Sequence, residues 1–153
     1  MFEIKRLLFI ALVLNFLLAT LSSANTSYGT GAGTGGSFQS FFGYAAGNGN
    51  VGTHNTGVGY GALNNSGSGQ WNTAVGYYSM VDNTSGDANV AMGYESLGKN
   101  TTGSYNTALG NFAMTENTTG SYNTSLGSQS LGKNVSGSNN VSLGYQAMYS
   151  NTT

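Results

Sequence analysis

A strict internal repeat constrains the fold of this chain more than any other feature of its sequence. Six asparagines recur at every seventeenth position, and the fourth residue after each is a glycine that follows an apolar residue. The asparagines are Asn55, Asn72, Asn89, Asn106, Asn123 and Asn140. The glycines are Gly59, Gly76, Gly93, Gly110, Gly127 and Gly144, and the apolar residues are Val58, Val75, Met92, Leu109, Leu126 and Leu143. A fixed period of this length indicates a solenoid whose coils bury their apolar residues against one another.

The composition of each unit favours strands over helices. The chain of 153 residues has 25 glycines and no proline, and each repeat is rich in Asn, Thr and Gly, which are poor helix formers. Residues 106–110 (NTALG) read as a short strand with alternating faces that ends at a turn glycine. We expect a second short strand near residues 111–115 and a return turn at 117–120. The sequence thus predicts an all-β, parallel β-solenoid or β-roll of about six 17-residue coils.

Stacking such coils in register aligns equivalent residues along the axis. We expect the six asparagines to form an amide ladder, the six glycines to occupy turns, and the six apolar residues to form the core. A disordered, low-complexity segment is the alternative that this composition allows. Apolar residues held at fixed positions in every period argue against it, because a disordered chain does not need them.

A second apolar residue follows each of these glycines by four positions, and we expect this column to form a second core row: Leu63, Met80, Leu97, Met114, Leu131 and Met148. Small residues precede both apolar positions of every repeat. The first set is Gly57, Ala74, Ala91, Ala108, Ser125 and Ser142, and the second is Ala62, Ser79, Ser96, Ala113, Ser130 and Ala147. On a strand, we expect them to face away from the core row and to form a smooth outer face. Because one coil buries little apolar surface, we expect copies of the chain to associate through that face.

The first residues have the pattern of a signal peptide. Lys5 and Arg6 precede an apolar run over residues 7–21, and Ser22, Ser23 and Ala24 supply a small-residue cleavage site. The sequence therefore predicts residues 1–24 as a signal peptide, 25–38 as a flexible Gly/Ser/Thr-rich lead-in, and 39–153 as the repeat domain. The alternative is an uncleaved anchor, although the run is shorter than the roughly 20 residues of a membrane span. After cleavage we expect no helical membrane anchor and a secreted or cell-surface location.

The repeat motif resembles the head repeats of YadA-like trimeric autotransporter adhesins, and similar repeats occur in some phage tail fibres. The resemblance rests on units such as NTAVGYYSM, NVAMGYESL, NTALGNFAM and NVSLGYQAM and covers residues 39–153. It implies a left-handed parallel β-roll that forms a homotrimer, with the apolar positions in the coil core and the Ala/Ser positions facing the trimer axis. Some members of that family bind collagen or other matrix proteins. The 17-residue unit is longer than the commonest head repeat, and residues 1–153 show no pattern of a stalk or barrel segment.

Few residues could support catalysis or bind a metal. The chain has no Cys, 6% charged residues and a single histidine, His54, for which a solvated turn is the expected location. The acidic residues of the repeats are interpreted as occupying non-equivalent positions, so that they form no carboxylate column along the axis. These residues are Asp82, Asp87, Glu95 and Glu116. We therefore predict no catalytic residues, no cofactor and no metal site. With Lys99 and Lys133 as the only cations beyond residue 6, the chain also lacks the basic footprint of a nucleic-acid-binding protein.

Two functions agree with these observations. The first is a non-enzymatic surface adhesin or structural rod that binds matrix proteins, cells or its own copies through a repeated face. The alternative is an ice-binding solenoid that displays a column of threonines, namely Thr84, Thr101, Thr118 and Thr152, which is interrupted at Gly67 and Val135.

Nine Asn-x-Ser/Thr sequons are expected to be turn residues in a bacterium and candidate glycan sites in a eukaryote.

Overall fold

The computed structural model describes residues 26–29, 33 and 37–152, which form one sheet of eight parallel strands. The strands are β1 (Thr26–Tyr28), β2 (Ser40–Phe42), β3 (Thr56–Val58), β4 (Thr73–Val75), β5 (Val90–Met92), β6 (Thr107–Leu109), β7 (Thr124–Leu126) and β8 (Val141–Leu143). The predicted all-β parallel solenoid is confirmed. The predicted signal peptide, residues 1–24, lies outside the described residues. Within the described part, no helix is long and apolar enough to cross a membrane.

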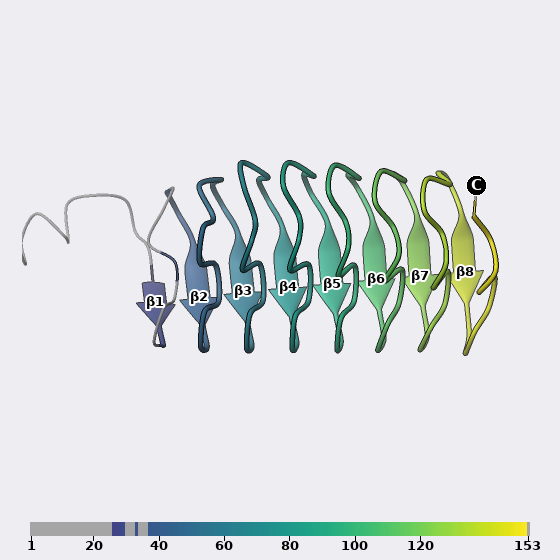
Figure 1. Cartoon of the computed structure of the whole chain (residues 1–153), viewed down its shortest axis with the longest axis horizontal. Helices are drawn as coiled ribbons and strands as arrows, with labels where there is room; N and C mark the ends of the chain where they lie inside the picture. Colours follow the sequence, from purple (N-terminus) through teal and green to yellow (C-terminus); the bar gives the residue numbers. More distant parts are fainter. Residues whose placement is uncertain (1–25, 30–32, 34–36, 153) are drawn as a thin grey trace, which may run out of the picture.

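The strands follow one another in the sheet in sequence order, so the chain winds in coils that stack along one axis (Figure 1). Thr56 pairs with Thr73, and from there on each strand pairs with the equivalent residues of the next repeat. The first two coils are shorter than the 17-residue repeat. Thr26 pairs with Ser40, 14 residues later, and Ser40 pairs with Thr56, 16 residues later. Seven steps between eight strands, at about 4.8 Å each, make a rod of about 34 Å.

Each described coil contains one of the two strands that the sequence predicted. In the coil of β6, residues 111–116 form turns, and Phe112 and Met114 have left-handed φ angles of 57° and 51°. The Ala113 N–H donates to the Gly110 carbonyl at 3.2 Å within the coil, whereas the Met114 N–H donates to Ser130 in the next coil at 3.0 Å. The predicted strand near 111–115 is therefore wrong, because its backbone alternates between local turns and bonds to the neighbouring coil.

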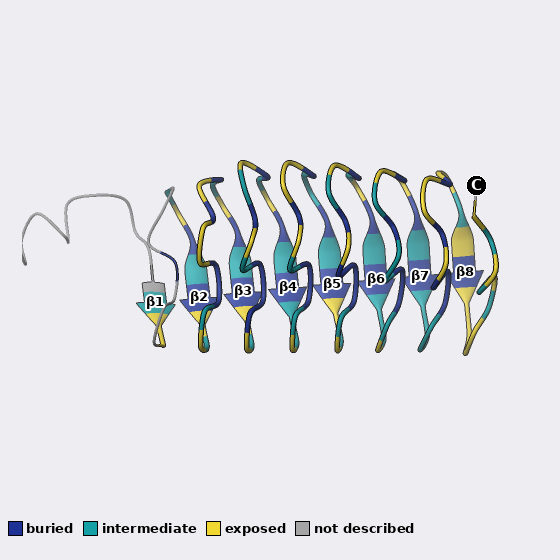
Figure 2. Ribbon diagram, in the orientation of Figure 1, coloured by how far each residue is buried: buried dark blue, intermediate teal, exposed yellow. Residues whose placement is uncertain are grey.

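The interior of a coil holds one large apolar side chain, and small residues surround it. The large residues are Leu63, Met80, Leu97, Met114 and Leu131, and none of them has exposed surface. The middle residue of each strand from β2 to β8 is buried, and these residues form the dark blue band across the strands in Figure 2. In β3–β8 these middle residues are small, namely Gly57, Ala74, Ala91, Ala108, Ser125 and Ser142. The second set of small residues is also directed inward, and Ala62, Ser79, Ser96, Ala113 and Ser130 are fully buried.

This arrangement reverses the predicted faces of the strands. Val58, Met92 and Leu143 are 37%, 46% and 68% exposed, and Val75, Leu109 and Leu126 are half-buried. The prediction that these six residues form the core, with the Ala/Ser residues on an outer face, is wrong. The interior has room for one large side chain per coil, and in the coils of β3–β7 the Leu or Met that follows the strand-end glycine by four positions fills it. Where Phe41 replaces a small residue, Gly47 stands opposite, and a Cβ there would lie 2.4 Å from the Phe41 ring.

The glycines that end the strands are required by the backbone. Gly59, Gly76, Gly93, Gly110, Gly127 and Gly144 have φ angles between 116° and 141°, a region that is essentially restricted to glycine. A Cβ on Gly76 would also lie 2.3 Å from the carbonyl oxygen of Gly93 in the next coil. These residues are turn glycines, as the sequence predicted.

The segment predicted as a flexible lead-in contributes a strand. β1 lies within residues 25–38 and pairs in parallel with β2. Tyr28 stacks on Phe42 with 5.5 Å between ring centroids. For residues 26–28 the prediction of a flexible segment is wrong, because the short TSY sequence supplies the same parallel strand pairing as the full repeats.

Candidate binding face

The outward-facing first and third residues of β2–β8 form a continuous surface along the rod, which we call the sheet face. Its first column is mainly threonine and consists of Ser40, Thr56, Thr73, Val90, Thr107, Thr124 and Val141. Its second column is apolar and consists of Phe42, Val58, Val75, Met92, Leu109, Leu126 and Leu143. All of these residues are exposed or half-buried. An exposed apolar column that runs through seven successive strands is a feature of interaction surfaces.

The sheet face contains no charged residue. The acidic and basic residues of the repeats all lie outside the strands, and they are Asp82, Asp87, Glu95, Lys99, Glu116 and Lys133. Depletion of charge and enrichment in apolar residues are typical of the centre of protein interfaces. The surface can therefore approach another protein without desolvating a charge.

Aromatic rings stack at both ends of the strands. Two residues after the strands, Tyr44, Tyr60, Tyr77 and Tyr94 form a stack with centroid separations of 5.0, 5.2 and 5.1 Å. Phe112 continues this stack at 5.1 Å from Tyr94 with a tilted ring. Two residues before the strands, Phe38, His54 and Trp71 stack, as do Tyr105 and Tyr122. Ala88 separates these two groups in the same column. Except for the 6.0 Å between His54 and Trp71, the centroid separations of the stacked rings are close to the spacing of about 4.8 Å between neighbouring strands.

Two phenols in the longer stack resist ionisation. Electrostatic repulsion from Tyr78, whose ring meets Tyr60 edge-on at 5.5 Å, raises the pKa of Tyr60, and desolvation adds to the shift. The Tyr94 phenol donates a hydrogen bond to the carboxylate of Glu95, which raises the pKa of Tyr94. Both side chains therefore remain neutral phenols through the physiological pH range.

The predicted asparagine ladder is present inside the coils. The Oδ1 of each asparagine accepts the backbone N–H of the next one, from Asn55 to Asn140, at 2.8–3.0 Å. The Nδ2 of Asn72 also donates at 2.9 Å to the carbonyl of Gly86. The equivalent bond is made by Asn55, Asn89, Asn106 and Asn123. Asn55, Asn72, Asn89, Asn106 and Asn123 are completely buried or nearly so. The ladder is therefore structural and is not part of the outer surface.

A second asparagine ladder runs beside the first one and was missed by the sequence analysis. Its members are Asn83, Asn100, Asn117, Asn134 and Asn151, and each Nδ2 donates to the Oδ1 of the preceding member at 2.7–3.1 Å. The Nδ2 of Asn83 also donates to the Gly86 carbonyl that receives the Asn72 bond, at 2.9 Å. The recurrence of these asparagines once in every repeat was the available signal for this ladder.

The second ladder is broken at one position. Ser66 stands in the column between Asn50 and Asn83, and its hydroxyl is buried without a hydrogen-bond partner. The Nδ2 of Asn50 is likewise buried and unpaired, although its Oδ1 accepts from Asn55 at 3.2 Å. A serine side chain is too short to bridge the two neighbouring amides.

Charged residues of alternating sign share one column on the turn side. Asp82, Lys99, Glu116 and Lys133 occupy the same position in successive repeats, and the Lys99 Nζ lies 2.8 Å from the Glu116 carboxylate. The interpretation that the acidic residues occupy non-equivalent positions is wrong for Asp82 and Glu116, which are two coils apart. Lysines separate them, so neighbouring coils present opposite charges at this column.

His54 lies at an exposed turn with a left-handed φ of 59°. Its Nδ1 is 3.0 Å from the Thr53 hydroxyl, and its ring lies between those of Phe38 and Trp71. Among the described residues, no group of three or more His, Asp and Glu side chains is placed to hold a metal ion. The geometry of His54 agrees with the predicted solvated turn.

Most of the sequons lie inside the rod. Asn83, Asn100, Asn117, Asn123 and Asn134 are fully buried and hydrogen-bonded in the two ladders. A glycosyltransferase cannot reach these amides in the folded chain. Asn64, by contrast, is partly exposed and lies within a turn.

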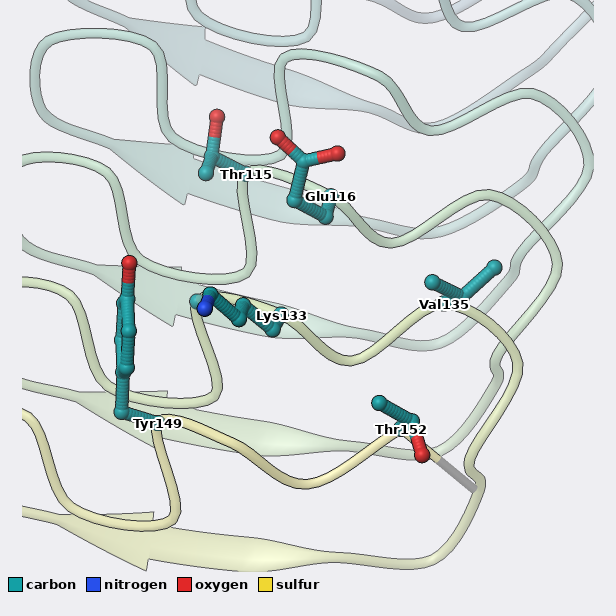
Figure 3. A pocket seen from close by; sticks show the side chains of 7 residues that line it. Thr115, Glu116, Lys133, Val135, Tyr149 and Thr152 are labelled. Carbon is teal, nitrogen blue, oxygen red and sulfur yellow. The ribbon is translucent and has the colours of Figure 1, made fainter.

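An open groove of about 360 Å³ lies between the turn segments of the last coils (Figure 3). Lys133 and Tyr149 lie on one side, and Val135 and Thr152 lie on the other. The Lys133 Nζ stands 5.1 Å from the Tyr149 ring centroid, and Glu116 is paired with Lys99. Both charges that line the groove are already engaged, so we assign no ligand to it.

Comparison with known proteins returned no match. No protein-family model matches the chain, and no curated protein or solved structure shows significant similarity to it. The resemblance to YadA-like heads remains a prediction that rests on the repeat motif.

Proposed function

We propose that this chain is an exported, non-enzymatic rod that adheres to matrix proteins, cell surfaces or its own copies through the sheet face. The observation that carries the proposal is the uncharged apolar column from Phe42 to Leu143, which lies on the outside along the described sheet. Stacked aromatic rings border the strands and add rigid contact area. Aromatic residues such as tyrosine and tryptophan are enriched among the few residues that supply most of the binding energy in protein interfaces.

Self-association, as a homotrimer, is the first form of adhesion that we propose. The rods are identical, and their sheet faces carry no charges that would repel one another. Each exposed apolar side chain that a neighbour covers contributes about 1–2 kcal/mol before the entropy of association is subtracted. This argument replaces the one from small residues, which lie in the interior. The trimeric state itself rests on the resemblance to YadA-like heads.

Lysine substitutions on the sheet face test the proposal. The double variant Val75→Lys/Leu109→Lys places two charges in the apolar column, whereas Thr102→Lys adds a charge at an exposed residue outside the face. Light scattering should give a multiple of the mature chain mass for the wild type and for Thr102→Lys, and a smaller particle for the double variant. Solid-phase binding to collagen, fibronectin and laminin should weaken in the same variant. A monomeric wild type that binds none of these proteins would overturn the proposal.

Ice binding is the second candidate, and one observation favours it. Thr56, Thr73, Thr107 and Thr124 lie in one outward column of a parallel sheet, with Val90 in the middle. The column that the sequence suggested is less suitable, because the hydroxyls of Thr84, Thr101 and Thr118 donate to carbonyls of the next coil at 2.8–3.0 Å. Thermal hysteresis and ice shaping by a chain that neither assembles nor binds matrix proteins would establish this candidate instead.

A further inference from the structure

The tyrosine stacks bring pairs of solvent-exposed phenols into fixed contact. Tyr77 and Tyr94 are 5.1 Å apart with ring planes at 4°, and Tyr105 and Tyr122 are 5.0 Å apart, also at 4°. Each ring belongs to a different coil, so the rung spacing sets the separation. All four side chains are exposed. An oxidant in solution can therefore reach both members of a pair, and the two rings remain neighbours while it acts.

We propose that these stacked tyrosines are sites of oxidative cross-linking, in which hydrogen peroxide and a haem peroxidase join neighbouring coils through dityrosine. This inference concerns a covalent modification and does not depend on the proposed adhesive function. Tyr105 and Tyr122 form the isolated pair, and Tyr44, Tyr60, Tyr77 and Tyr94 form a longer stack in which any neighbours can react.

The reaction balances without any group from the chain other than the two phenols. The peroxidase removes one electron and the phenolic proton from each tyrosine, and one hydrogen peroxide is reduced to two waters. The two phenoxyl radicals then form a carbon–carbon bond between ring carbons adjacent to the phenol carbon. Each of these carbons passes its hydrogen to the phenol oxygen, which restores aromaticity. The chain thus loses two hydrogens for each link.

The link would join residues that are one repeat apart in sequence but adjacent in space. It would tie one coil to the next along the rod axis, where strand pairing and side-chain ladders hold the coils together. Closing a loop in this way restricts the unfolded chain. We expect the cross-linked chain to melt at a higher temperature than the untreated chain.

The chain offers a matched set of variants for the test. Tyr122→Phe keeps the stacked ring but removes the phenol, so the fold should be retained while the pair cannot react. Tyr145 serves as an internal control, since it is highly exposed and Ser128 stands next to it in its column. A glutamate-specific protease cuts after Glu95 and after Glu116, and the second cut separates Tyr105 from Tyr122. A link between these two tyrosines therefore leaves the peptides 96–116 and 117–153 joined.

The experiment treats the dilute, folded mature chain with hydrogen peroxide and peroxidase, then digests it in denaturant and records peptide masses. We expect the joined peptide, two hydrogens lighter than the sum of its parts, to depend on Tyr105 and Tyr122 and to vanish in Tyr122→Phe. A chain unfolded in urea before oxidation should give at least a tenfold lower yield. Equal yields from folded and unfolded chain, or links that fall mainly on Tyr145, would overturn the proposal.

Discussion

Restoring the broken asparagine ladder should stabilise the rod, and Ser66→Asn is the substitution that does so. In the later coils, the Nδ2 of each ladder asparagine donates to its own coil's glycine carbonyl at 2.9–3.0 Å. Its Oδ1 accepts a hydrogen bond from the Nδ2 of the next ladder asparagine. An asparagine at 66 can make the equivalent bonds to the Gly69 carbonyl and to Asn83. It also replaces a buried hydroxyl that has no partner.

The magnitude follows from the number of bonds. Two new buried hydrogen bonds, each worth about 1 kcal/mol net, raise the free energy of unfolding by about 2 kcal/mol, less the entropy of fixing the longer side chain. The reciprocal variant Asn100→Ser removes the bonds to Asn83, Gly103 and Asn117 at 2.7, 2.9 and 2.8 Å. It should lower the free energy of unfolding by about 2–4 kcal/mol, because Asn117 keeps a buried donor without its partner.

Urea unfolding followed by circular dichroism measures both changes. Ser68→Asn and Asn48→Ser are the matched controls, because they make the same exchanges at exposed positions. Each control should stay within about 0.5 kcal/mol of the wild type. If Ser66→Asn behaves like Ser68→Asn, or if Asn100→Ser costs no more than Asn48→Ser, the ladder does not stabilise the fold and the reasoning fails.

Three further predictions concern the coil, the N-terminus and pH. Deleting residues 106–122 should remove one coil and leave a cooperative fold. Deleting residues 106–113 should lower the melting temperature much further, because it breaks the register of every column. Similar melting temperatures for the two variants would contradict the assignment of one repeat to each coil. N-terminal sequencing of the exported protein should begin at Asn25, and a sequence that starts at Met1 would contradict signal cleavage. The pKa values of Tyr60 and Tyr94 are raised in the folded chain, so these phenols keep protons that the unfolded chain loses above about pH 10. The melting temperature should therefore fall as pH rises through that range. Tyr60→Phe should reduce this fall, and a melting temperature that is independent of pH there would refute the argument.

The sequence alone determined the period, the class of fold and the first ladder. Identical spacing of Asn55, Asn72 and the later asparagines is explained by the stacking of equivalent residues, and glycines at the strand ends permit the turn that stacking needs. The second ladder and the charge column were also accessible from the sequence, because Asn83 and Asn100, like Asp82 and Lys99, are separated by one repeat period.

Only the tertiary structure decided which side of each strand faces inward. Alternation along a strand such as Thr107–Leu109 defines two faces, but it does not tell which of them another segment covers. Here the opposite wall is a series of turns with left-handed residues such as Met114, and that residue's side chain fills the interior. The remaining space accepts only a small residue such as Ala108. Leu109 is therefore directed outward, and the face that sequence reasoning assigned to the core became the candidate binding face.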